Sequence, residues 1–381
     1  SNGDWYDAGE ATLNPNDPRM LAGTPGSGVL INGHVGKTAS LVSQEQFQDV
    51  QVHLEFMVAK GSNSGVSFHG NYEIQILDSA HVGKPTGAHC GGIYPRAENE
   101  PTYHHIDAGS PPRMNAAKVP GEWQTLDIIF QSPRLDEKGN KIGNAKFDRV
   151  GHNGLVIQED VELAWANGAN WNRPQRPRGP VIIQGDYGPI AIRNATVREW
   201  DGDADLLNIP PPGFTALFNG KDFEGWHTPP LVQKYWSVDD GVLKSPGLIE
   251  TWGASLATKK HYRDFVLLID FRMPTISDSG INFRRLIPEI PGFGDMEQFN
   301  LRSRGGMGHL ESYYFLPKET AKKVGLKEDE TPHVRHIDPE VGVWHTVKLI
   351  VQGRTLSAEF DGEVLYDNFE YHDWMMNMEP A

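Results

Sequence analysis

The feature that most constrains the fold of this chain is an internal repetition. Residues 50–58 read VQVHLEFMV, and 215 positions later residues 265–273 read FVLLIDFRM with a similar alternation of apolar side chains. An apolar residue at every second position is typical of a β-strand with one face on a core. At the same offset, SGVSF at 64–68 matches SGINF at 279–283. We therefore predict two copies of one all-β unit.

Two further pairs of segments keep the same order. GEWQT at 121–125 matches GVWHT at 342–346, and each precedes an apolar segment. Asn153-Gly154 and Asp361-Gly362 each lie between short apolar segments, where type I′ hairpin turns are expected. The residues expected in the two cores are Val52, Leu54, Phe56 and Trp123 in the first copy, and Leu267, Ile269, Phe271 and Trp344 in the second.

A change of composition marks the boundary between the copies. DGDAD at 201–205 is followed by PPPG at 210–213, and such a stretch suits a short stiff linker rather than a strand. We expect a first domain at 1–203, a Pro-rich linker at 204–213 and a second domain at 214–381. Many short strands with Gly and Pro turns predict antiparallel β-sandwiches. A short helix is expected at 318–324.

Composition excludes several classes of protein. The 381 residues include 35 Lys and Arg against 50 Asp and Glu, and the net charge of −15 disfavours binding to nucleic acid or anionic lipid. Cys90 is the single cysteine, which excludes an intrachain disulfide framework and a multi-cysteine zinc site. No run of about 18 apolar residues is present, so we expect no transmembrane segment.

The strand expected at 72–78, YEIQILD, carries candidate chemistry. Its alternation places Glu73 and Gln75 on the face opposite Ile74. His69 lies just upstream and Asp78 just downstream, and carboxylates with an imidazole near one sheet surface can perform general acid–base catalysis. A solvated edge strand is the alternative interpretation.

Histidines and tryptophans in loops give weaker signals. YHHID at 103–107 and HVRHID at 333–338 contain candidate metal ligands, but neither has a fixed spacing to a third ligand. CGGIY at 90–94 is typical of a packed turn rather than of a reactive thiolate. The tryptophans expected in loops, where they can pack or stack on a sugar ring, are Trp165, Trp171 and Trp226.

Longer segments follow one another in a characteristic order. The second copy opens with FTALFNGKDFEGW at 214–226. The first copy contains NSGV at 63–66, YEIQILD at 72–78, PGEWQT at 120–125, GPVIIQGDYGP at 179–189 and Arg193-Asn194. In order and spacing these segments resemble the 3-keto-disaccharide hydrolase domain family, formerly a domain of unknown function, over nearly the whole chain. The resemblance implies two tandem antiparallel jelly-roll sandwiches of the concanavalin A-like lectin and glucanase type.

The chain departs from the family pattern at two positions. Tyr187 stands where the family usually has His after Gln-Gly-Asp, and this change argues against a metal-binding or proton-transfer role at that position. His69 stands where members often carry Arg, as the second copy does at Arg284.

The resemblance implies cleavage of the glycosidic bond of 3-keto-glycosides or related sugars. A ketone at C3 acidifies the C2 proton, so the bond can break by elimination, which needs a base, an enediolate stabiliser and an acid. We assign Glu73 or Asp78 as the base and His69 as the acid or a metal ligand. A divalent metal could instead stabilise the enediolate as a Lewis acid, and we assign no residues as its ligands. The expected substrate-binding residues are Gln75, Gln184 and Asp186 in the first copy, and Arg284, Glu297 (as the counterpart of Glu73) and Arg302 in the second.

Two further expectations follow. A carboxylate flanked by Asp78 or Asp186 should have a raised pKa, as a base near neutral pH requires. The lone cysteine, the acidic surface and, above all, the family resemblance favour a periplasmic or secreted bacterial protein, whose signal peptide would precede this numbering. The alternatives are a non-catalytic, lectin-like glycan-binding module, which Tyr187 favours for the first copy, and a purely structural role.

Overall fold

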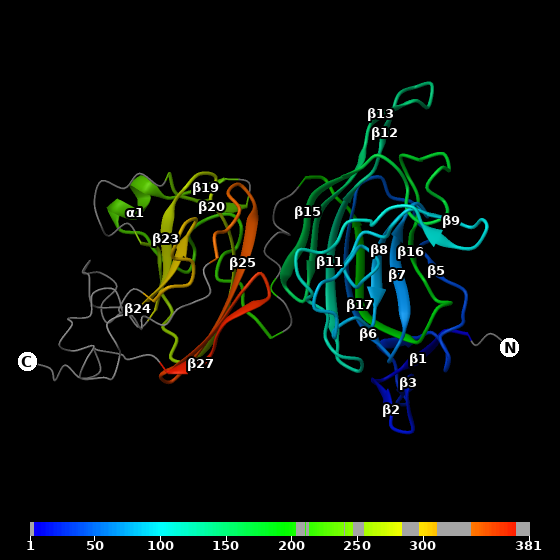
Figure 1. Ribbon diagram of the computed structural model, residues 1–381, viewed down its shortest axis with the longest axis horizontal. Coiled ribbons are helices and arrows are strands. Elements are labelled where there is room, and N and C mark those ends of the chain that lie inside the picture. The colour runs from blue at the N-terminus through cyan, green and yellow to red at the C-terminus, as the bar shows by residue number, and fades with distance from the viewer. Residues whose placement is uncertain are drawn as a thin grey trace, which may run out of the picture. The chain divides into compact units, whose positions relative to one another are not determined.

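The computed structural model describes residues 4–202, 210, 213–239, 241–246, 255–283, 297–310 and 337–370. These residues form many β-strands and one short helix, and the chain divides into two compact units, Ser1–Asp203 and Ala204–Ala381 (Figure 1). The described residues contain no helix with the length and apolar character that a membrane span requires. The predicted all-β fold is confirmed.

The first unit is a jelly-roll type sandwich of two antiparallel sheets, with seven strands in one and four in the other. The larger sheet has the order β1 (Tyr6–Ala8), β4 (Val29–Ile31), β17 (Ile190–Glu199), β6 (Val50–Val58), β11 (Gln124–Gln131), β14 (Ala145–His152) and β15 (Leu155–Leu163). The smaller sheet has the order β5 (Leu41–Val42), β16 (Val181–Ile183), β7 (Asn63–Phe68) and β8 (Tyr72–Leu77). Three short ribbons pair β2 (Ala11–Asn14) with β3 (Asp17–Gly23), β9 (Ala97–Glu98) with β10 (His104–His105), and β12 (Arg134–Leu135) with β13 (Lys141–Gly143).

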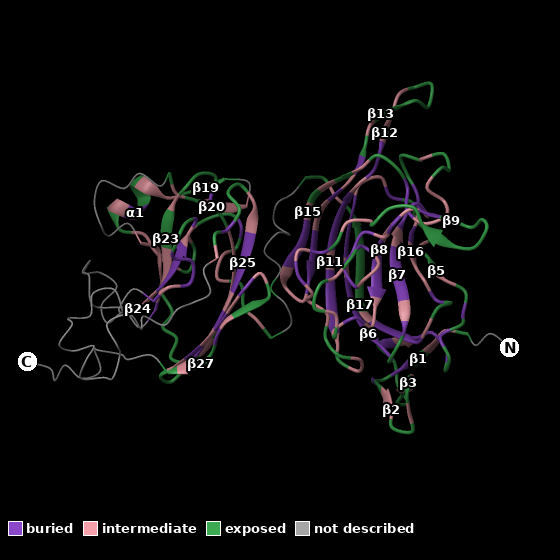
Figure 2. Cartoon of the chain, viewed as in Figure 1, coloured by how far each residue is buried: buried purple, intermediate pink, exposed green. Residues whose placement is uncertain are grey.

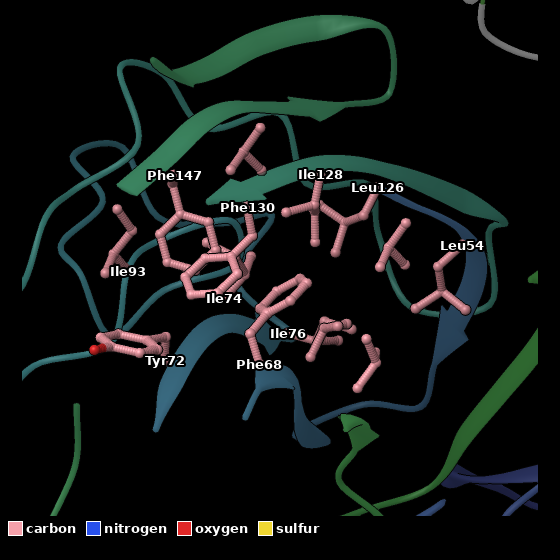
Figure 3. Packing of buried hydrophobic residues seen from close by; sticks show 14 of the residues in the cluster. Leu54, Phe68, Tyr72, Ile74, Ile76, Ile93, Leu126, Ile128, Phe130 and Phe147 are labelled. Atoms are coloured by element: carbon pink, nitrogen blue, oxygen red, sulfur yellow. The ribbon is translucent and has the colours of Figure 1, made fainter. Parts of the chain in front are cut away.

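The core of the first unit lies between these two sheets (Figure 2). Phe68 of the smaller sheet stacks on Phe130 of the larger one, with ring centroids 4.9 Å apart, and Phe147 meets Phe68 edge-on (Figure 3). Alternate residues of β8 join this cluster, as Figure 3 shows for Ile74 and Ile76. The predicted core residues Val52, Leu54 and Phe56 of β6 are all buried, as expected.

The second unit, within its described residues, has a four-stranded antiparallel sheet and a separate hairpin. The sheet has the order β22 (Phe265–Arg272), β25 (Trp344–Gln352), β26 (Thr355–Phe360) and β27 (Glu363–Glu370), and the hairpin pairs β23 (Asp278–Phe283) with β24 (Glu297–Arg302). Short elements are β18 (Trp226–His227), α1 (Pro230–Tyr235), β19 (Ser237–Asp239), β20 (Val242–Lys244) and β21 (Ala257–Thr258). Helix α1 was not expected; it begins at Pro230, whose fixed φ suits a first helical turn. The expected helix at 318–324 lies outside the described residues.

The second predicted core trio is less buried than the first. Leu267, Ile269 and Phe271 pack against the core of the second unit but are only half-buried. The reason lies in sheet position, because β6 pairs on both sides whereas β22 pairs only with β25 in the described sheet. An edge strand has one neighbour fewer to cover its side chains.

Both predicted hairpin turns are present and have the expected geometry. Asn153 and Gly154 have φ of 53° and 81°, and Asp361 and Gly362 have φ of 48° and 77°. Positive φ at both central residues defines the type I′ turn that Asn-Gly and Asp-Gly favour.

The two tryptophans predicted in the cores are instead half-buried beside arginines. The guanidinium of Arg193 lies 4.0 Å from the ring centroid of Trp123, and that of Arg272 lies 5.1 Å from Trp344. Trp123 also packs against the smaller buried cluster of the first unit that includes Leu21 and Ile31, so its prediction as a core residue holds in part.

Candidate functional site

The outer face of the smaller sheet in the first unit gathers polar side chains. Because Tyr72, Ile74 and Ile76 of β8 face the core, Glu73 and Gln75 point to the opposite face. Across the ladder, Glu73 lies opposite Ser67 and Gln75 lies opposite Gly65.

Gln184 extends the same ladder from β16. Ile183 pairs with Val66, and the N–H of Gln184 then donates to the carbonyl of Gly65 at 3.0 Å. Val66 and Ile183 both pack on the core, so Gln184, the next residue, belongs to the outer face. The structure thus brings Glu73, Gln75 and Gln184 onto one face.

A glycine makes room for the carboxylate of Glu73. A Cβ built on Gly65 would lie 2.2 Å from Glu73 Oε1 and 3.0 Å from its Cγ and Cδ. The side chain of Glu73 therefore leans across β7 into the space that a larger residue would fill. Its carboxylate therefore lies over Gly65, the residue that pairs with Gln75 and accepts the N–H of Gln184.

The environment of Glu73 changes its acidity. Burial and, to a smaller extent, the negative charge of Asp186 together raise the pKa of its carboxyl to about 7. The raised pKa agrees with the expectation from neighbouring carboxylates, but the larger cause is loss of water rather than charge. Glu73 can therefore accept a proton near neutral pH and give it back.

The two glutamines differ in freedom. Gln75 is buried, and its Nε2 donates to Asn63 Oδ1 at 3.1 Å. Gln184 is half-buried, and its carbonyl accepts from the hydroxyl of Ser64 at 2.7 Å. Gln75 is thus held in place, whereas no side-chain hydrogen bond is recorded for Gln184 among the described residues.

A segment that the sequence did not assign to the site borders Glu73. Ile93 forms an antiparallel β-bridge with Ile74, and both side chains are buried in the core. The N–H of Tyr94 donates to the carbonyl of Glu73 at 3.1 Å. Tyr94 follows a core-facing residue, so its side chain lies on the outer face next to Glu73. Asn167 Oδ1 accepts from the N–H of Glu73 at 3.0 Å on the same edge.

Tyr94 is the centre of an aromatic network. The hydroxyl of Tyr103 donates to Tyr94 Oη at 3.1 Å, and Nε2 of His105 lies 3.1 Å from the same oxygen. Burial raises the pKa of the Tyr94 hydroxyl, and Tyr103 and the charge of Glu73 raise it further. In the 103–107 segment, His105 thus contacts a phenol, and His104 bonds the carbonyl of Thr102 through Nδ1.

Two predicted catalytic residues lie apart from Glu73. The ring of His69 packs edge-on against Phe130 of the core at 5.3 Å, its Nδ1 is 3.2 Å from the carbonyl of Arg176, and burial lowers its pKa. Asp78 lies past the end of β8, about 17 Å along an extended chain from Glu73, and accepts from the N–H of Gly61 at 2.8 Å.

The remaining signature residues of the first unit differ in exposure. Asp186 and Tyr187 are exposed, and Asp186 is close enough to influence Glu73. Cys90 is buried and burial raises its pKa to about 12, which agrees with a packed turn.

Of the tryptophans proposed for sugar stacking, one has a largely exposed ring, although Lys141 Nζ lies 5.7 Å from the centroid of that ring. Trp165 is 54% exposed and meets Trp171 edge-on at 5.9 Å, while the guanidinium of Arg96 lies 5.2 Å from the Trp171 centroid. Trp226 is half-buried and its Nε1 donates to the carbonyl of Leu217 at 2.7 Å. Trp165 alone of the three offers a large exposed ring.

The hairpin of the second unit has the same register as β7 and β8. Gly280 lies opposite Asn300, as Gly65 lies opposite Gln75. A Cβ on Gly280 would lie 2.5 Å from Cγ and Cδ of Gln298, so Gln298 crosses Gly280 as Glu73 crosses Gly65.

The position equivalent to Glu73 is therefore Gln298, where we had expected Glu297. Glu297 is buried and pairs with Phe283 at the end of the hairpin. Arg302 bonds Asp278 through Nε at 2.9 Å, and Arg284 lies outside the described residues. The second unit carries an amide where the first carries a carboxylate.

A metal site does not emerge from the acidic and histidine side chains that the structure describes. Within these residues, no group of three or more His, Cys, Asp or Glu could hold an ion. Beside the candidate site the carboxylates are Glu73 and Asp186, and the former is half protonated near pH 7. His333 and His336 lie outside the described residues.

Comparison with known proteins identifies the family. The model of the 3-keto-alpha-glucoside-1,2-lyase-like domain matches residues 3–198 and 213–378. A 3-keto-disaccharide hydrolase of Bacteroides thetaiotaomicron is 21% identical over 226 residues, which cover 52% of this chain and 73% of that protein.

Two solved structures from Parabacteroides distasonis ATCC 8503, both provisionally classed as glycosyl hydrolases, are also similar. One is 25% identical with a TM-score of 0.31, covering 52% of this chain and 81% of its own. The other is 20% identical with a TM-score of 0.33, covering 52% of this chain and 100% of its own. The family match alone spans most of the sequence, and it indicates a carbohydrate-active, hydrolase-like protein. The chain belongs to the family of 3-keto-alpha-glucoside-1,2-lyase-like domains.

Proposed function

We propose that the first unit cleaves the glycosidic bond of 3-keto-glycosides, with Glu73 as the base. The observation that carries the proposal is the half-buried carboxylate of Glu73, which lies over Gly65 with a pKa of about 7. A base works best when its pKa is close to the working pH, because it is then both largely ionised and sufficiently basic.

The reaction follows from the acidity of a proton next to a ketone. Glu73 removes the C2 proton, and the electrons of that bond form an enediolate with the C3 oxygen. The ketone then re-forms, C1 and C2 become doubly bonded, and the bond from C1 to the glycosidic oxygen breaks. The products are an unsaturated keto sugar and an alcohol, and addition of water to the former gives net hydrolysis.

The amides beside Glu73 suit the binding of sugar hydroxyls. Gln184 offers a side-chain N–H and a carbonyl oxygen on the same face, and Gln75 keeps its carbonyl oxygen free of the bond that its Nε2 makes to Asn63. A donor at the position where negative charge develops stabilises an enediolate. We assign stabilisation of the enediolate to Gln184, and we assign sugar stacking to Trp165 because its ring is largely exposed.

The chemistry belongs to the first unit rather than to the second. Gln298 occupies the position of Glu73, and a neutral amide cannot accept the C2 proton. This substitution favours the second candidate function, non-catalytic glycan binding, for the second unit alone. Calorimetric titration of the Glu73→Gln protein with an unoxidised oligosaccharide, with and without Gln298→Ala, tests that role. Glycan binding by the second unit is supported if the heat of oligosaccharide binding is lost only in the double variant.

The test of catalysis is incubation of the protein with a 3-keto-glucoside, with and without a chelator. Glu73→Gln keeps the shape of the side chain and removes the base, so we expect a loss of at least 100-fold in rate with little change in melting temperature. Asp78→Asn is the matched control and should retain activity. Full activity of Glu73→Gln would overturn the proposal, and loss on chelation would show that a metal takes part.

A further inference from the structure

The elimination needs an acid for the departing oxygen, and the aromatic network beside Glu73 contains one. Its three members are Tyr94 and Tyr103, which lie in loops of the first unit, and His105, which lies in β10. Resting on the proposed function, we propose that the hydroxyl of Tyr94 protonates the glycosidic oxygen as the bond to C1 breaks, with Tyr103 and His105 as positioning residues.

Placement is the first argument for this role. Residues 91–94 run along the edge of β8, because Gly91 N–H donates to the carbonyl of Gln75 at 2.8 Å and Tyr94 N–H donates to that of Glu73 at 3.1 Å. Ile93 faces the core, so Tyr94 and Glu73 are neighbours on the outer face. An acid and a base side by side on one surface can act on adjacent atoms of one sugar ring.

Protonation state is the second argument. A tyrosine hydroxyl ordinarily has a pKa of about 10, and burial raises the pKa of Tyr94 further, so this hydroxyl carries its proton at neutral pH. Glu73, whose pKa is about 7, is the group that can receive one. The two environments separate an acid from a base, as the reaction requires.

The network also accounts for the fate of the tyrosine after transfer. Once the proton has moved to the leaving oxygen, Tyr94 is a phenolate with Tyr103 Oη and His105 Nε2 each 3.1 Å away. Hydrogen bonds to an ionised oxygen are stronger than those to a neutral one. The proton that Glu73 took from C2 then returns to Tyr94 through solvent, so both groups regain their starting states and no other reactant is needed.

His69 and Tyr187 are both less suited than Tyr94 to the role of acid. The ring of His69 packs on Phe130 in the core, away from the outer face. Tyr187 is close enough to raise the pKa of Tyr94, but it is 64% exposed and no hydrogen bond is recorded for its hydroxyl within the described residues, so nothing holds it in position. Tyr187→Phe is therefore the matched control for Tyr94→Phe.

The test varies the leaving group. We expect Tyr94→Phe to slow cleavage of an alkyl 3-keto-glucoside at least 100-fold but that of the nitrophenyl 3-keto-glucoside less than fivefold, since nitrophenolate leaves without an acid. Exposed His105 should fold normally as His105→Ala and show a smaller loss with the same preference. Tyr187→Phe should match the wild type with both substrates. An equal loss with both substrates would overturn the assignment to Tyr94.

Exchange at C2 separates this inference from the proposed function. In deuterium oxide, Tyr94→Phe should still incorporate deuterium at C2 of the alkyl substrate, because its base is intact. Glu73→Gln should not. Exchange by Glu73→Gln overturns the proposed base, whereas absence of exchange in Tyr94→Phe overturns only the separation of acid from base.

Discussion

The glycine beneath the carboxylate of Glu73 offers a direct test of the site, through the substitution Gly65→Ala. The new Cβ would lie 2.2 Å from Glu73 Oε1, whereas ordinary contact begins at 3.4 Å. The carboxylate oxygen must therefore move by about 1 Å, because closely packed atoms do not tolerate such an overlap. A catalytic group misplaced by about 1 Å can lose about 100-fold in rate.

The expected effect on stability is small and partly cancels. Replacing a glycine in a strand interior gains about 0.5–1 kcal/mol, and forcing a side chain from its rotamer costs about 0.5–1.5 kcal/mol. The free energy of unfolding should thus change by about 1 kcal/mol or less. A large fall in kcat/KM at nearly constant melting temperature is the expected signature of Gly65→Ala.

The second unit supplies the control, Gly280→Ala. Its Cβ would lie 2.5 Å from Cγ and Cδ of Gln298, so the steric conflict is similar, but no carboxylate is displaced. Kinetics with a 3-keto-glucoside and thermal unfolding should be measured for both variants. Wild-type activity of Gly65→Ala, or an equal loss in Gly280→Ala, would refute the placement of the chemistry at Glu73.

Three further predictions concern acidity and packing. The rate should rise with pH around a midpoint near 7 as Glu73 ionises, and Asp186→Asn should move that midpoint lower by removing a negative charge; an unmoved midpoint contradicts the pairing. Phe56→Ala should cost about 3–5 kcal/mol of unfolding free energy in denaturant titration, and Phe271→Ala about half as much, because its ring is only half-buried; equal costs contradict this. Burial lowers the pKa of His152 to about 3, below about 6.5 in the unfolded chain, so only the unfolded state gains a proton as the pH falls between these values. Stability should therefore fall across that range, by about 1.4 kcal/mol per unit at most, and this loss should be absent in His152→Gln.

Strand alternation was sufficient to predict the face of β8 that carries Glu73, because alternation is a local property of extended backbone. The same rule predicted the burial of Leu54 and Phe56. It failed to place His69, which lies in the turn after β7 with φ of 57°. A residue in the left-handed backbone conformation interrupts the strand alternation. His69 therefore does not lie beside Glu73, although it precedes β8 by only three residues.

Register between strands is a non-local property, and here the sequence was misleading. Aligning acidic residues equates Glu297 with Glu73, but the ladder equates Gln298 with it, one position along. A shift of one residue moves a side chain to the other face of a sheet. Tyr94 was missed for a related reason, since only the pairing of residues 91–94 with β8 brings it beside Glu73.

The comparison of the two hairpins separates what the fold requires from what the chemistry requires. Both hairpins keep a glycine across from an amide, Gln75 in one and Asn300 in the other, and both lay a long polar side chain across that glycine. The crossing is therefore compatible with either Glu or Gln and does not depend on charge. What differs is the group at its end, a carboxylate with a raised pKa in Glu73 and an amide in Gln298. Because an amide makes the same crossing in the second unit, packing alone does not require a carboxylate at Glu73, and the proposed proton transfer gives that carboxylate a reason.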